Sequence, residues 1–99
     1  LCEFGCTAGA KGVTPEGWAG DALDDLLGGR WPEVAGFSWW NERWENGDDK
    51  QRHPDTTMRL QDNPALAKIF RERLERAGEK AVARPIFQPE KGVPVRAAR

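Results

Sequence analysis

The sequence predicts an α/β fold made of two consecutive βα units. Residues 1–4 have the length of a short strand, residues 34–39 form a second one that is apolar on both faces apart from Ser38, and a segment with helical periodicity follows each of them. Near-continuous apolarity indicates strands buried on both faces, as in a parallel sheet covered by helices. A strand, a helix and a second strand form a βαβ unit, which is right-handed and parallel. An open doubly wound sheet and a (β/α)8 barrel both contain such units, and this pattern does not separate them.

Both helices have recognisable boundaries. Thr14-Pro15-Glu16 supplies a hydroxyl N-cap, a proline at the first helical position and an acid in the first turn, and Gly28-Gly29 ends this helix. Asp62-Asn63-Pro64 starts the second helix in the same way, and Gly78 closes it. The polar segment 41–61 before the second helix is predicted to be a long loop, and loops of such length are usually functional or mobile.

Composition restricts the classes of function. The net charge of −1 gives no general attraction to nucleic acid or to an anionic membrane, and no apolar run approaches the ~20 residues of a membrane-spanning helix. Cys2, Cys6 and His53 do not have the spacing of a zinc site, so neither a metal nor another cofactor is expected. We expect residues 1–78 to form a folded part and residues 79–99 to form a flexible basic tail. We also expect the folded part to be a fragment of a longer protein. The oligomeric state and the compartment stay open.

Three tryptophans in one short segment form the main candidate binding site. Trp39, Trp40 and Trp44 stand beside Asn41 and Glu42 at the end of the second predicted strand. An indole stacks on the C–H face of a pyranose ring, while polar neighbours address its hydroxyl groups. The segment therefore predicts binding of an oligosaccharide or polysaccharide. The alternative is that the indoles serve only in packing.

Glu3 is the second candidate, because it lies at the end of the first predicted strand. In parallel α/β folds the loops after the strands carry the ligand chemistry at one edge of the sheet. A carboxylate there suits a nucleophile or general base, and alternation allows it to face the same cavity as Trp39. The structural alternative is a loop cap or an ion pair with Arg30, Arg43 or Arg59.

Cys2-Glu3-Phe4-Gly5, a crossover helix and then Gly36-Phe37-Ser38-Trp39-Trp40-Asn41-Glu42 together resemble clan-A glycoside hydrolases, in particular family 26 and related β-mannanase-like proteins. The resemblance implies strands seven and eight of a (β/α)8 barrel with their helices. It implies that Glu3 is the catalytic nucleophile and that Trp39 lines the sugar subsite at the scission point. Trp40 stands where the family often has a basic residue, so either Trp39 or Trp40 stacks on the sugar.

The resemblance covers residues 1–77 and implies a fragment of a retaining glycoside hydrolase that cleaves β-linked glycans, β-mannan or a related polymer. Retaining hydrolysis needs two carboxyl groups about 5–5.5 Å apart, and the general acid/base glutamate of such enzymes has no counterpart in this sequence. We therefore expect the fragment to be inactive alone and its parent to be secreted or periplasmic. The alternative is a non-catalytic carbohydrate-binding or degenerate barrel fragment.

Overall fold

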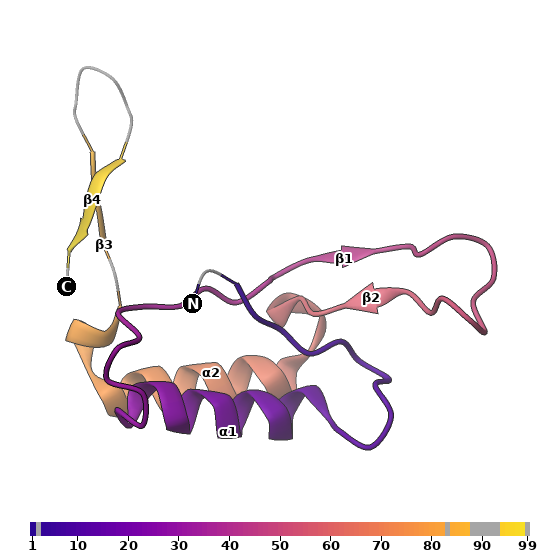
Figure 1. Cartoon of the computed structure of the whole chain (residues 1–99), viewed down its shortest axis with the longest axis horizontal. Helices are drawn as coiled ribbons and strands as arrows, with labels where there is room; N and C mark the ends of the chain where they lie inside the picture. The colour runs from indigo at the N-terminus through magenta and orange to yellow at the C-terminus, as the bar shows by residue number, and fades with distance from the viewer. Residues whose placement is uncertain (2, 83, 88–93, 99) are drawn as a thin grey trace.

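The structure, a computed structural model, describes residues 1, 3–82, 84–87 and 94–98 (Figure 1). Two α-helices, α1 (Pro15–Leu27) and α2 (Pro64–Ala77), lie side by side and form one layer. No helix in the described part of the chain is long and apolar enough to cross a membrane. The rest of the molecule consists of short strands, turns and extended segments beside this layer.

Both helices begin and end where the sequence predicts. The Thr14 hydroxyl accepts the backbone N–H of Gly17 at 3.1 Å, and the Asn63 side-chain oxygen accepts the N–H of Leu66 at 3.0 Å. These N-caps satisfy backbone donors that the first helical turn leaves without partners. Gly78 ends α2 with a φ of 85°, a left-handed conformation that glycine adopts without a side-chain clash.

The two helices run parallel, with their N-termini at the same end. Near these starts, the side-chain amide of Asn63 donates to the Glu16 carboxylate at 2.7 Å. Further along, Arg73 donates to Asp24 at 2.6 Å. Between these polar contacts the helices bury a small apolar core made of Ala19, Leu23, Leu66 and Phe70. Phe37 and Trp39 pack against this core.

The prediction of two βα units of a barrel is wrong. Among the residues that the structure describes, the predicted strands share one isolated parallel bridge, between Phe4 and Trp39, and a hydrogen bond from the Leu1 ammonium to the Gly36 carbonyl at 3.1 Å. There the Phe4 N–H donates to Ser38 O at 3.0 Å and the Trp40 N–H donates to Phe4 O at 2.8 Å. The described residues form a small mixed domain with two α-helices and two-stranded sheets. Because the helices cover one side of the bridge, the second face that these residues were expected to bury stays open. Gly36 and Ser38, which alternate with Phe37 and Trp39, are exposed.

Both regular sheets are antiparallel hairpins. In the first, β1 (Arg43–Trp44) pairs with β2 (Thr56–Thr57), so the predicted long loop is a hairpin with an extended tip. In the second, β3 (Arg84–Phe87) pairs with β4 (Pro94–Ala98) and stands away from the helical layer (Figure 1).

Two short 3-10 helices flank α2, one on each side. They are η1 (Leu60–Asp62), which links β2 to α2, and η2 (Glu79–Ala81), which follows α2. The segment 79–99, predicted as a basic tail, thus contains η2 and the β3–β4 hairpin, while Ala83, residues 88–93 and Arg99 lie outside the described residues. The position of η1 places it next to the tryptophan-rich segment.

Candidate functional site

The Phe4–Trp39 bridge divides the candidate residues between two faces. The rings of Phe4 and Trp39 lie 5.4 Å apart and pack toward the helices, where Trp39 meets Phe70 of α2 at 5.0 Å. Neighbouring residues of an extended segment point to opposite faces. The bridge therefore groups Glu3 with Trp40 on the face that points away from the helices, which we call the outer face.

Trp39 belongs to the aromatic packing between the bridge and the helices. Its ring lies 6.2 Å from that of Trp18 in α1, and its indole N–H donates to the carbonyl of Met58 at 2.8 Å. A half-buried indole whose N–H is already bonded has little left to offer a ligand. The structure thus separates Trp39 from its sequence neighbour Trp40.

Trp40 and Trp44, here called the indole pair, lie at the surface. Their side chains are 37% and 40% exposed, their ring centroids are 5.8 Å apart and their planes meet at 71°. Trp40 follows the bridge directly, and Trp44 lies in β1 opposite Thr56. Two large rings therefore form an angled apolar corner on the outer face.

Polar side chains connect the segment that carries the indole pair to residues 59–62. Both polar atoms of Asn41 are engaged: its oxygen accepts the Leu60 N–H at 2.7 Å and its amide donates to Gln61 at 3.0 Å. Asp62 accepts a hydrogen bond from Arg59 at 2.9 Å and lies 3.7 Å from Arg43; these are the distances between carboxylate oxygens and guanidinium nitrogens. The backbone segment beside the indole pair is therefore anchored to η1.

Glu42 and Glu3 are the two predicted carboxylates of the site, and both are exposed. The backbone carbonyl of Glu42 accepts the Met58 N–H at 2.9 Å, and its side chain is exposed to solvent. Within the described residues, the Glu3 side chain makes no hydrogen bond or ion pair, and the arginines considered as its partners bind aspartates instead. Glu3 is therefore a solvated acid on the outer face.

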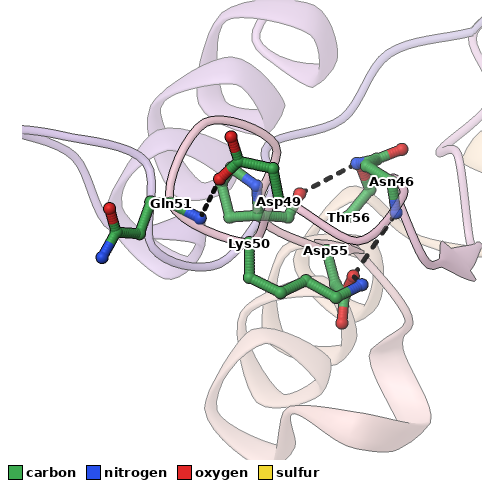
Figure 2. Close-up of polar contacts among 7 residues, drawn as sticks. Asn46, Asp49, Lys50, Gln51, Asp55 and Thr56 are labelled. Atoms are coloured by element: carbon green, nitrogen blue, oxygen red, sulfur yellow. Dashed lines mark hydrogen bonds and ion pairs between the residues drawn. The ribbon is translucent and has the colours of Figure 1, made fainter.

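An open hollow of about 600 Å³ lies at the tip of the β1–β2 hairpin. Figure 2 shows the polar contacts that close this tip: Asn46 donates to Thr56 at 2.6 Å and Lys50 to Asp55 at 2.6 Å. The hollow is lined by Glu45, Asn46, Gly47, Arg52, His53 and Pro54. Its members belong to one exposed turn, so it is a surface depression and not a closed pocket. Across the described chain, no three His, Cys, Asp or Glu side chains gather as a metal site requires.

Shifted pKa values mark structural contacts. Burial raises the pKa of the Cys6 thiol, and the Glu16 carboxylate adds to this effect. The hydrogen bond from Asn63 lowers the pKa of Glu16. The hydrogen bond from Lys50 lowers the pKa of Asp55 at the hairpin tip. Cys6 is a buried thiol, Glu16 belongs to the contact between the two helix starts, and Asp55 belongs to the hairpin tip.

Sequence reasoning missed two residues that organise the outer face. Met58 forms backbone hydrogen bonds with the Trp39 indole and with Glu42. Its sulfur also packs closely against Gly5, because a Cβ at Gly5 would lie only 2.6 Å from the Met58 sulfur. Asp62 connects two arginines across the hairpin base. Asp62 was read only as part of a helix start, and its second role depends on contacts between distant segments that no local pattern records.

Comparison of the chain with models of protein families, with curated proteins and with solved structures gives no significant match. The resemblance to glycoside hydrolases therefore stays a prediction based on the quoted motifs.

Proposed function

We propose that the outer face binds a β-linked glycan, with the indole pair as its stacking platform. The observation that carries the proposal is the exposure of two neighbouring tryptophans, 37% for Trp40 and 40% for Trp44, whose rings lie 5.8 Å apart. Large apolar rings usually pack inside a protein. Two neighbouring rings open to solvent suit a ligand with apolar faces and a rim of hydroxyl groups, which describes a pyranose.

The shape of the indole pair fits more than one sugar residue. Because the rings meet at 71°, they form a corner and not one flat surface. One sugar can stack on the face of one indole while the second indole contacts the edge of that sugar or the next residue. The exposed side chain of Glu42 can accept hydrogen bonds from sugar hydroxyls at the rim.

The direct test is a titration of the chain with β-linked oligosaccharides, including manno-oligosaccharides, followed by tryptophan fluorescence. Stacking on an aromatic side chain is worth about 1–3 kcal/mol by analogy with base stacking. Trp40→Ala should therefore weaken binding about 5- to 150-fold. Trp44→Ala should also weaken it.

Trp31 offers a matched control for this titration. It is also exposed, at 46%, but it follows the end of α1 and lies beneath the Arg30 guanidinium at 5.5 Å. Trp31→Ala should leave the affinity unchanged. An equal loss at Trp31 and Trp40, or no loss at Trp40, would reject the indole pair as the platform.

A second candidate function is glycoside hydrolysis with Glu3 as the nucleophile. The observation that favours it is that the bridge groups Glu3 with Trp40 on one face. In this reaction a carboxylate oxygen of Glu3 attacks the anomeric carbon, and the glycosidic oxygen leaves with a proton from a second carboxyl group about 5–5.5 Å away. We place that second group outside these 99 residues.

A 2-fluoro glycoside with a dinitrophenolate leaving group tests this step, because such a leaving group departs without a proton. Attack by Glu3 would release dinitrophenolate and leave a glycosyl ester on the peptide that contains Glu3, detectable by mass spectrometry. Glu3→Gln should abolish the adduct. Absence of an adduct on the unmodified chain would reject the nucleophile role and leave glycan binding as the proposed function.

A further inference from the structure

We propose that Asn41 is a positioning residue, which fixes the angle of the indole pair by tying its backbone to η1. Asn41 directly follows Trp40 and lies three residues before Trp44, so it controls the segment between the two rings. The effect on glycan affinity rests on the proposed function, whereas the geometry of the rings does not.

The hydrogen bonds of Asn41 carry the argument. Its side-chain oxygen accepts the Leu60 N–H at 2.7 Å, and its amide donates to Gln61 at 3.0 Å. Asn41 thus has one acceptor and one donor group, and both are committed to η1 across 19 and 20 residues of sequence. A side chain with both groups engaged by the protein is better suited to holding its own backbone than to addressing a sugar.

The neighbouring contacts show why this tie matters for the rings. Towards its N-terminal side the segment is held by the Trp39 indole, whose N–H bonds the Met58 carbonyl at 2.8 Å. Towards its C-terminal side it is held by the two pairs of the β1–β2 ladder, Arg43 with Thr57 and Trp44 with Thr56. Between these two supports the Glu42 carbonyl accepts the Met58 N–H at 2.9 Å, and Asn41 supplies the side-chain anchor directly after Trp40. We therefore expect the course of the backbone from Trp40 to Trp44 to depend on Asn41.

The indole pair provides its own spectroscopic signal. Two indoles at 5.8 Å and 71° couple their electronic transitions and give an exciton couplet in far-ultraviolet circular dichroism, which needs no ligand. Trp18 and Trp39, at 6.2 Å, form a second coupled pair, so the measurement is made on a Trp18→Phe background. Trp44→Phe on this background should remove the couplet and identify its source.

On the same background, Asn41→Leu should abolish the couplet while the helical ellipticity persists. Asn41→Asp keeps an oxygen for the Leu60 N–H and should retain the couplet. Gln61→Ala removes only the outer hydrogen bond and should retain it too. A couplet that survives in Asn41→Leu, or is lost in both Asn41 variants, would overturn the proposal. If Asn41→Leu loses its helical signal, Asn41→Ser is measured in its place, since a serine hydroxyl is too short to reach the Leu60 N–H. Loss of the couplet in Asn41→Ser then supports the proposal, and a couplet that survives overturns it.

The glycan titration separates this inference from the proposed function. Asn41→Leu should weaken oligosaccharide binding roughly tenfold, which corresponds to about 1.4 kcal/mol, and Asn41→Asp should restore it. If the unmodified chain binds no glycan, the proposed function fails and the couplet still decides the role of Asn41. A third outcome is that glycan binds and Asn41→Leu loses the couplet without losing affinity. Asn41 then positions the rings, but their angle does not set glycan affinity, and the claimed effect of Asn41 on affinity is overturned.

Discussion

Gly20 lies in the middle of α1, buried against α2, and its replacement by alanine should stabilise the protein. Alanine is favoured over glycine in a helix interior by about 0.8–1.0 kcal/mol. A Cβ at this position would lie 3.5 Å from a guanidinium nitrogen of Arg73 and 3.8 Å from a methyl carbon of Ile69, which are ordinary van der Waals distances. The helix gain should therefore be realised nearly in full, at about 1 kcal/mol.

Thermal unfolding followed by circular dichroism measures this gain. For a domain of this size about 1 kcal/mol raises the Tm by roughly 4–8 °C. Gly17→Ala is the matched control in the same helix, because its Cβ would lie 3.0 Å from the Thr14 hydroxyl that caps α1. Crowding of the cap should cancel the propensity gain there. A lower Tm for Gly20→Ala would mean that α1 and α2 pack more closely than described, and would refute the helical layer as drawn.

Other predictions concern the core and the response to acid. Leu23→Ala removes a fully buried side chain from the helix interface and should cost about 2–5 kcal/mol, measured by urea unfolding. Glu16 has a lowered pKa because Asn63 donates to its ionised carboxylate, so its contribution to stability is complete above its unfolded pKa and is lost as pH falls through the lower folded pKa. Glu16→Gln should therefore lose less stability than the unmodified chain between pH 7 and pH 3. Equal losses would show that the bond between the helix starts does not favour the ionised form.

The helix boundaries could be predicted because their determinants are local. Thr14 and Asn63 each cap a helix from the position directly before a proline, and both side chains accept the N–H three residues on. These contacts depend on neighbours in sequence and not on the rest of the fold. The same local signals say nothing about what the helices pack against.

The sheet could not be predicted from the apolar run at residues 34–39. Strand pairing depends on partners that are distant in sequence, and here the only pairing of this run, within the part of the chain described, is the bridge from Phe4 to Trp39. The apolar pattern predicts burial on two faces, but the chain places helices on one side of the bridge. Gly36 and Ser38, which alternate with Phe37 and Trp39, consequently lie exposed.

The sequence likewise left open whether Trp39 or Trp40 stacks on a sugar. Alternation guarantees that adjacent residues of an extended segment face opposite ways, but not which of them faces the helices. That choice is made by the packing of Trp39 against Trp18 and Phe70 and by its bond to the Met58 carbonyl. The exposed position of Trp40 follows from these distant contacts.

Isothermal titration calorimetry with a β-linked manno-oligosaccharide should compare the unmodified chain with a Trp40→Ala, Trp44→Ala double variant, because this variant removes both rings of the proposed platform. We expect saturable binding to the unmodified chain and to the Trp31→Ala control, and none to the double variant. Undiminished binding after removal of both indoles, or no binding of any β-linked glycan by the intact chain, would mean that the indole pair is not a glycan platform.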